Sequence, residues 1–300
     1  MLDYIKQSFP QGYDLGAYFS HLLEEKCGKR IMDDEVAFIA IYFYNSLIEQ
    51  NKKTGTKKIA VISSLKNSST ILFRQTLLNW FPNDILKLDF INPGDVSEDI
   101  LEDYDIYLTT EKGRYLDMGI AMLINPFPNN QDYLNIKLAI DGFKNMEDIT
   151  QIFGKELFTA FTSADKAEVL TSLCEKVEMK YHLNTLYDEI LQRENIGSTF
   201  FSKAIAVPHP MHAVSADTFV AVGISKEPIT WDEDKNSINL ILLVCIGKNN
   251  PQAFQLWNYI ARMLSDKHFI EKVMEQPTYD NFISIIEKSF YLWVKNSDVN

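Results

Sequence analysis

The run Lys203-Ala-Ile-Ala-Val-Pro-His-Pro210 carries a short apolar segment into an imidazole side chain. Residues 204–207 predict a buried strand, and Pro208 ends it because proline has no N–H to donate to a neighbouring strand. His209 therefore follows directly on the exit of this strand. Upstream, Arg193, Ser198 and Thr199 precede the histidine by 16, 11 and 10 residues.

These side chains together indicate a phosphohistidine site. An imidazole nitrogen can accept a phosphoryl group, an arginine matches phosphate oxygens in pairs, and hydroxyls can add hydrogen bonds. We predict that His209 is the phosphoacceptor and that Arg193 stabilises the phosphate. We predict Ser198 and Thr199 as phosphate-binding residues, and we expect neither a metal nor a cofactor to take part.

Each of these residues also has a structural interpretation, and two supporting candidates share this ambiguity. His209 can be a buried histidine bonded to the backbone, and Arg193 can bond the last carbonyls of a helix. The two hydroxyls can cap the next element. Glu194 is either a local ion-pair partner or a residue that orients the histidine. His212 is either an assisting imidazole or a surface loop residue.

Composition limits the function classes. A chain of 300 residues with 46% hydrophobic content can form two to three domains. A net charge of −12 argues against nucleic-acid binding by this chain, because phosphate backbones attract basic surfaces. No apolar run approaches the roughly 20 residues that a membrane helix needs, and the start lacks a secretory signal. Cys27, Cys174 and Cys245 are widely spaced, which predicts reduced thiols in a cytoplasmic protein.

Residues 1–52 are predicted to be helical. Leu15 and Phe19 share one helical face, Gly28 breaks the pattern, and the acids at 33–35 suit the start of a second helix. Two such helices make a poor domain alone. We expect them to pack on a partner or to be the remnant of a larger helical domain.

Two α/β segments follow. Residues 57–144 alternate between helical stripes and short apolar stretches at 59–62, 86–90, 106–108 and 120–124, which predicts a small parallel sheet covered by helices. Residues 155–292 predict a larger α/β unit, with Ser163 as a candidate helix cap. Its strands at 204–207, 218–224 and 238–246 have helical patterns on both sides in sequence, so a mixed, buried sheet is expected.

The last segment resembles the enzyme IIA domain of the fructose/mannitol class of the bacterial phosphotransferase system. The matching pieces are Arg193-Glu194, Gly197-Ser198-Thr199, Ala206-Val207-Pro208-His209 and Pro228-Ile229-Thr230-Trp231. In that family the histidine is phosphorylated and the arginine lies near it. A second histidine is common on the helix that is expected to start near Gln252. This chain reads Gln252-Ala-Phe-Gln-Leu-Trp257 there, which argues against efficient onward transfer to a sugar-transporting partner.

The two earlier segments resemble other modules of the same system. Residues 57–144 resemble an enzyme IIB domain, whose first loop normally carries a phosphorylatable cysteine. The loop in Val61-Ile-Ser-Ser-Leu-Lys-Asn-Ser-Ser-Thr70 has Ser63 instead, and a hydroxyl without a base is a poor nucleophile. Residues 1–52 resemble part of a PTS regulation domain through Asp34-Glu35-Val-Ala-Phe-Ile-Ala-Ile-Tyr42, where the family usually ends the motif in histidine.

This order of segments resembles the C-terminal end of multidomain sugar-operon regulators of the activator and antiterminator families. The resemblance implies a phosphoacceptor regulatory protein rather than a turnover enzyme. Its donor would be the histidine-containing phosphocarrier protein or a IIB protein, and we expect a homodimer. Nucleic acid would be bound only through a region N-terminal to Met1, so we expect a fragment or truncated form. Two alternatives stay open: an active enzyme IIA phosphocarrier in a sugar transport chain, and a non-phosphorylated interaction scaffold.

Overall fold

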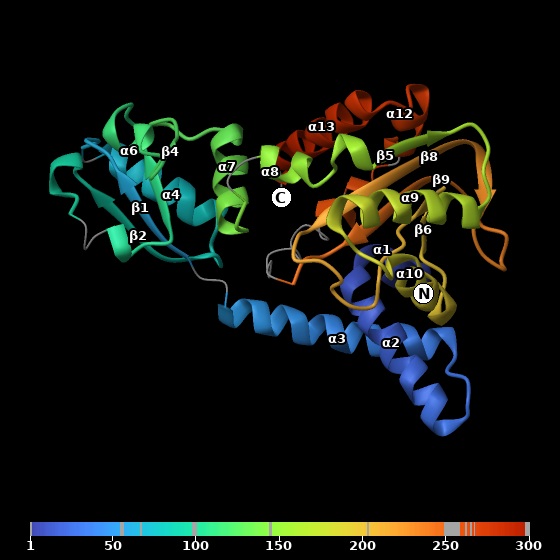
Figure 1. Ribbon diagram of the computed structural model, residues 1–300. Helices are drawn as coiled ribbons and strands as arrows, with labels where there is room; N and C mark the ends of the chain where they lie inside the picture. The colour runs from blue at the N-terminus through green and yellow to red at the C-terminus, as the bar shows by residue number, and fades with distance from the viewer. Residues whose placement is uncertain are drawn as a thin grey trace. The chain divides into compact units, whose positions relative to one another are not determined.

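The computed structural model describes residues 2–54, 57–66, 68–97, 101–143, 146–202, 204–248, 259–261, 263–264, 266 and 268–297. The chain divides into two compact units. The first unit comprises Met1–Leu47 with Glu147–Phe290, and the second comprises Ile48–Met146 with Tyr291–Asn300. An N-terminal helical region, a parallel sheet and a mixed sheet with helices are present, so the predicted fold class is confirmed (Figure 1). Among the described residues, no helix combines the length and apolar composition needed to cross a bilayer.

The second unit contains a four-stranded parallel sheet of order β2-β1-β3-β4. Its strands are β1 (Lys57–Ile62), β2 (Ile85–Ile91), β3 (Ile106–Thr109) and β4 (Met122–Leu123). Helices α4 (Ser68–Trp80) and α7 (Asn130–Ile140) share one apolar core with β1. The short helices are η1 (Pro93–Asp95) and α6 (Arg114–Asp117). Burial of residues 59–62 explains the unbroken apolar run in β1, as expected for a covered parallel strand.

The first unit contains a five-stranded mixed sheet of order β5-β8-β9-β7-β6. Its strands are β5 (Phe158–Phe161), β6 (Phe200–Ser202), β7 (Ile205–Ala206), β8 (Phe219–Thr230) and β9 (Ser237–Cys245). The pairs β5–β8 and β7–β9 are parallel, whereas β8–β9 and β6–β7 are antiparallel. Residues 219–225 of β8 are all buried, so both faces of the sheet are covered there.

The helices after residue 145 are α8 (Met146–Gln151), η2 (Lys155–Leu157), α9 (Lys166–Tyr181), α10 (Leu186–Ile196), α12 (Phe269–Glu275) and α13 (Tyr279–Ser297). Helix α9 crosses the sheet and shares its main core (Figure 1). Its cap is Asp165 rather than the predicted Ser163, because Asp165 and Glu168 form a reciprocal capping box. The start of the helix expected near Gln252 lies outside the described residues, whereas residues 259–261 and 263–264 are described and are helical.

The strand predicted at residues 204–207 is shorter in the structure. β7 covers only Ile205–Ala206, because Ala204 turns the chain from β6 with a φ of 69°. Val207 leaves the sheet ladder and donates its N–H to the carbonyl of Thr199 at 2.9 Å. Pro208 follows, and its carbonyl accepts from the N–H of Val244 at 3.0 Å. Backbone hydrogen bonds to Thr199 and Val244 therefore fix the two residues that precede His209.

The N-terminal helices α1 (Leu2–Ser8), α2 (Pro10–Cys27) and α3 (Asp33–Thr54) begin the first unit. Helices α2 and α3 approach closely because α2 carries glycine at positions 12 and 16. A Cβ atom on Gly12 would lie 2.5 Å from the carbonyl oxygen of Ala40, and one on Gly16 would lie 2.8 Å from its nitrogen. Ala37 and Ala40 are fully buried at this contact. The predicted face of Leu15 and Phe19 is instead partly exposed, since small residues form the helix contact.

Candidate functional site

His209 lies where the chain leaves β7, and its ring is fixed by the backbone. Nδ1 is 2.8 Å from the carbonyl oxygen of Val207, so Nδ1 carries the proton that this acceptor binds. Nε2 therefore faces the rest of the site. The side chain is 17% exposed, which leaves the ring at the surface of the fold rather than inside its core.

Arg193 occupies the last turn of α10 and is buried to 4% exposure. Its Nε donates to His209 Nε2 at 3.2 Å, and its Nη1 donates to the carbonyl oxygen of Gly197 at 3.0 Å. Arg193 therefore makes both kinds of predicted contact. Its guanidinium faces His209, and it also bonds a backbone carbonyl just after α10. These bonds fix the guanidinium with its Nε edge towards the histidine.

Asp14 on α2 is a third member of this cluster, and no feature of the sequence indicated it. Arg193 Nη2 donates to Asp14 Oδ1 at 2.7 Å, and Asp14 Oδ2 lies 3.2 Å from His209 Nε2. The carboxylate therefore contacts both the guanidinium of Arg193 and Nε2 of His209. It comes from a helix 179 residues earlier in the chain than Arg193.

Electrostatics at this cluster favour the charged forms of Asp14 and Arg193. Burial raises the pKa of Asp14, but the charges of His209 and Arg193 and their hydrogen bonds outweigh it, so the pKa lies well below its usual range. Burial lowers the pKa of Arg193, and the opposing charge and hydrogen bond of Asp14 leave it raised. Both shifts favour the ion pair over the neutral forms at neutral pH.

The two predicted hydroxyls lie at the same site but are already bonded to carboxylates. Ser198 Oγ donates to Asp232 Oδ2 at 2.7 Å. Thr199 bonds Glu194 through its hydroxyl and through its N–H, the latter at 3.0 Å. Glu194 also accepts from Lys166 Nζ at 2.6 Å. Glu194 therefore anchors the loop that carries the hydroxyls.

His212 lies apart from this cluster in its contacts. Its side chain is 70% exposed, and Nδ1 is 3.5 Å from Glu189 Oε2. This matches the surface-loop alternative, whereas its role as an assisting imidazole stays a prediction.

A small cavity unites the predicted site residues. His209, Arg193, Ser198 and Thr199 all line it, together with Lys6, Tyr13 and Asp14 from the N-terminal helices. The cavity is large enough to hold water. Asp14 Oδ2 lies on its Nε2 side, 3.2 Å from that nitrogen.

The first loop of the second unit has a related arrangement without an imidazole. Ser63 Oγ and Thr110 Oγ1 lie 2.5 Å apart. Ser64 donates its N–H to Glu111 Oε1 at 2.6 Å and also bonds this carboxylate through its hydroxyl. A cavity of about 250 Å³ beside Glu111 is lined partly by Lys112 and Arg114. A carboxylate of the chain again accepts the hydrogen bonds of a loop.

Comparison with curated proteins extends over nearly the whole chain. It is 22% identical over 295 residues to the "Probable licABCH operon regulator" of Bacillus subtilis, covering 96% of this chain and 45% of the relative. It is 21% identical over 304 residues to the transcriptional regulator ManR of Bacillus subtilis, covering 96% and 46%. The chain thus spans about half the length of these relatives. A transport protein of Escherichia coli, the 2-O-alpha-mannosyl-D-glycerate-specific EIIABC component, is 24% identical over 162 residues, 52% of this chain and 24% of that protein.

Comparison with solved structures gives partial matches to IIA proteins. Nitrogen regulatory protein IIA-Ntr from Neisseria meningitidis has a TM-score of 0.42 at 20% identity and covers 46% of this chain and 98% of that chain. IIA mannitol from Escherichia coli has a TM-score of 0.38 at 20% identity and covers 45% and 98%. Residues 151–289, which contain His209 and Arg193, match the family described as "Phosphoenolpyruvate-dependent sugar phosphotransferase system, EIIA 2".

Proposed function

We propose that this chain is the regulatory segment of a cytoplasmic sugar-operon transcriptional regulator, controlled by phosphorylation of His209 by the phosphotransferase system. The observation that carries the proposal is the contact between Arg193 Nε and His209 Nε2 in the segment that matches the EIIA 2 family. The similarity to two sugar-operon regulators over 96% of the chain supports the regulatory role.

The geometry suits transfer to Nε2. Because Nδ1–H is held by Val207, the lone pair on Nε2 is the nucleophile that attacks the phosphorus of a phosphohistidine donor. The donor's N–P bond breaks as the new N–P bond forms, and the donor imidazole leaves with the electron pair and takes up a proton. Arg193 would neutralise the charge on the transferring oxygens. Ser198 and Thr199 can add hydrogen bonds once their hydroxyls turn from the carboxylates.

The proposal includes the domain assignment. Residues 1–52 would be part of a PTS regulation domain, residues 57–144 an enzyme IIB-like domain without its cysteine, and residues 155–292 the enzyme IIA domain. The donor would be the histidine-containing phosphocarrier protein or a IIB protein. The assembly would be a homodimer, and contact with nucleic acid would be made by a region outside this sequence.

The test is labelling with purified, radiolabelled phosphocarrier. The chain is expected to take up acid-labile label, and His209→Ala should lower uptake by more than about 100-fold, since the nucleophile is lost. His268→Ala is the matched control, because this histidine is 68% exposed and is not among the predicted site residues. Its label should equal that of the unaltered chain. Equal labelling of His209→Ala and the unaltered chain would reject His209 as the phosphoacceptor and leave a scaffold role.

Similarity to the EIIABC component over 52% of the chain favours a second candidate, an active phosphocarrier in a transport chain. The two functions differ in where the label goes next. Adding a IIB protein and a sugar permease to the labelled chain would transfer label to sugar in a transport chain. Label that stays on the chain supports the regulator.

A further inference from the structure

Helix α2 places Asp14 where a phosphoryl group on His209 would lie. Its oxygens are 3.2 Å from His209 Nε2 and 2.7 Å from Arg193 Nη2. A carboxylate resembles a phosphoryl group in its negative charge and in the oxygen acceptors that it offers to a guanidinium. We propose that the phosphoacceptor face of the IIA domain is an interaction surface for the helical segment of the same chain, held by Asp14 until phosphorylation of His209 displaces it. This inference rests on the proposed function.

The packing of α2 directs Asp14 towards the IIA domain. Gly12 and Gly16 contact α3 at Ala40, and Asp14 lies two residues from each of them. Two residues correspond to about 200° around a helix, so Asp14 lies on the side of α2 opposite α3. Tyr13 beside it is 8% exposed, and its hydroxyl lies 3.6 Å from the position of a Cβ on Gly197. The segment thus meets the IIA domain beside the loop after α10.

Asp14 and a phosphoryl group exclude each other at this site. Asp14 Oδ1 already accepts from the guanidinium that would bind the phosphoryl oxygens, so the two anions compete for one donor. Asp14 also stands within 3.2 Å of the Nε2 lone pair that must attack the donor. Transfer therefore requires the carboxylate to move. Afterwards the phosphoryl group adds roughly −1.5 to −2 charges where Asp14 had been, and like charge prevents its return.

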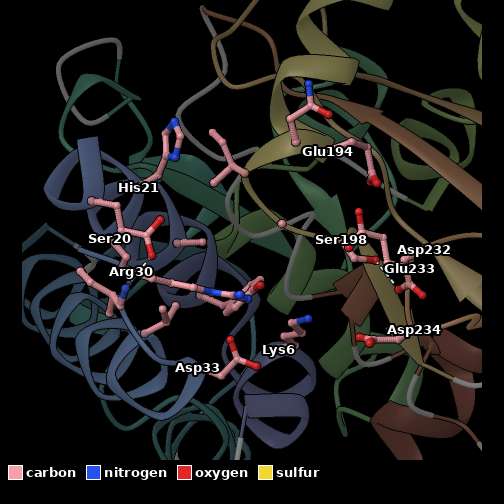
Figure 2. Close-up of a pocket in the computed structure, with 18 of the residues that line it drawn as sticks. Lys6, Ser20, His21, Arg30, Asp33, Glu194, Ser198, Asp232, Glu233 and Asp234 are labelled. Atoms are coloured by element: carbon pink, nitrogen blue, oxygen red, sulfur yellow. Dashed lines mark hydrogen bonds between the residues drawn. The ribbon is translucent and has the colours of Figure 1, made fainter. Parts of the chain in front are cut away.

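The rest of this contact combines apolar packing with a cavity. Ile196 at the end of α10 packs against the core of the N-terminal helices, which includes Ile5 and Tyr13. A cavity of about 680 Å³ lies between the N-terminal helices and the IIA domain, both of which belong to the first unit. Figure 2 shows Arg30 and Asp33 on one side of this cavity and Glu194, Ser198 and the acids at 232–234 on the other. Its walls carry charges of both signs, as in reversible interfaces between domains.

Two residues that line this cavity carry a buried polar atom without a partner. The hydroxyl of Ser20 and the indole N–H of Trp231 have no hydrogen-bond partner among the described residues. A buried donor without an acceptor is unfavourable, so these two residues add little to the attachment. The ion pair at Asp14 is the part of the attachment that phosphorylation changes.

Thermodynamic linkage between docking and phosphorylation gives the expected size of the effect. If phosphate on His209 weakens the docking of α2 by some factor, docking must weaken phosphorylation at equilibrium by the same factor. Coupling between two sites usually amounts to about 5-fold to 150-fold. Removing the charge of Asp14 should therefore shift the phosphoryl equilibrium between carrier and chain towards the chain by a factor in this range.

Docking can be measured by the distance between two spin labels on the full chain. Cys27 at the end of α2 is exposed, whereas Cys174 and Cys245 are buried, so a thiol label attaches selectively. Met179→Cys adds a second label on α9, at a side chain that is 80% exposed. The unphosphorylated chain should give a narrow distance distribution, and carrier-dependent phosphorylation should broaden it.

Asp14→Asn tests the role of the charge, because the amide keeps the size of the side chain. This variant should broaden the distribution without phosphorylation and raise the equilibrium label. Asp34→Asn is the control, since it removes one exposed aspartate from α3 in the same segment. It should behave as the unaltered chain does in both measurements.

The outcomes separate this inference from the proposed function. Label on His209 with an unchanged narrow distribution would overturn the release of α2 and leave the phosphoacceptor role intact. No label on the chain would overturn both. A narrow distribution and unchanged equilibrium label in Asp14→Asn would show that the carboxylate does not hold the segment.

Discussion

The two units each hold a carboxylate that accepts hydrogen bonds beside a cavity, but the surroundings of the two carboxylates differ. In the first unit, Asp14 meets an imidazole and a guanidinium that is 4% exposed. In the second unit, Glu111 meets the N–H and hydroxyl of Ser64, and Lys112 and Arg114 line the cavity beside it. The first site therefore combines an imidazole with a buried guanidinium, whereas the donors to Glu111 are neutral. Under the proposed function, only the first site is expected to accept a phosphoryl group.

The largest expected effect concerns the residues that donate hydrogen bonds to the two carboxylates, Arg193 to Asp14 and Ser64 to Glu111. Arg193→Lys keeps a positive charge but cannot contact His209, Gly197 and Asp14 together, as the planar fork does. The initial rate of labelling by the carrier should fall by about 100-fold, the usual effect of losing a transition-state donor. Ser64→Ala removes the hydroxyl that bonds Glu111 and should leave the rate unchanged. A similar loss in both variants would contradict the contrast between the units.

A smaller contrast concerns stability. Glu194 has a side chain 5% exposed and accepts from both Lys166 and Thr199, so Glu194→Gln should destabilise the first unit by about 2 kcal/mol. Glu111→Gln should cost the second unit about 0.5 kcal/mol, because its partner Ser64 is exposed and the amide can still accept. Native-state hydrogen exchange reports each unit separately. A larger loss in the second unit than in the first would reverse the ranking.

The smallest expected effect is a pH dependence of docking. The pKa of Asp14 is depressed in the docked state, so its contribution is complete above the ordinary value of about 3.9 and is lost as the pH falls below it. His209, Arg193, Lys6 and Tyr13 line the same cavity. The spin-label distribution of the unaltered chain should broaden from about pH 4 downwards.

Two controls sharpen this pH prediction. Asp14→Asn lacks the titrating group, so its distribution should not change between about pH 6 and pH 3. In the second unit, hydrogen bonds from Ser64 lower the pKa of Glu111, so the stability that this carboxylate gives to the second unit is also lost in acid. Identical acid broadening in Asp14→Asn and the unaltered chain would assign the effect to another group.

The sequence predicted those features that depend on local patterns. The parallel sheet of the second unit and the mixed sheet of the first follow from apolar runs and their spacing. Four site residues, His209, Arg193, Ser198 and Thr199, come together at one cavity as their proximity in sequence suggested. The strand at 204–207 was predicted too long because the left-handed turn at Ala204 has no glycine to mark it.

Asp14 could not be predicted, because its partners are far along the chain and no periodicity relates them. The face of α2 that contacts α3 was not predicted either. The sequence placed Leu15 and Phe19 on one helical face, and each is about 40% exposed. Close helix contact was achieved with glycine and alanine instead, and such contacts depend on backbone shape rather than on hydrophobicity.

The close contact of α2 with α3 also constrains which variants of this chain can survive selection. At Gly12 and Gly16 even a methyl group would meet the backbone of Ala40 within 3 Å. In a deep mutational scan these two positions should tolerate fewer substitutions than the large apolar residues beside them. A ranking of positions by hydrophobicity would place the intolerant sites on the wrong side of the helix.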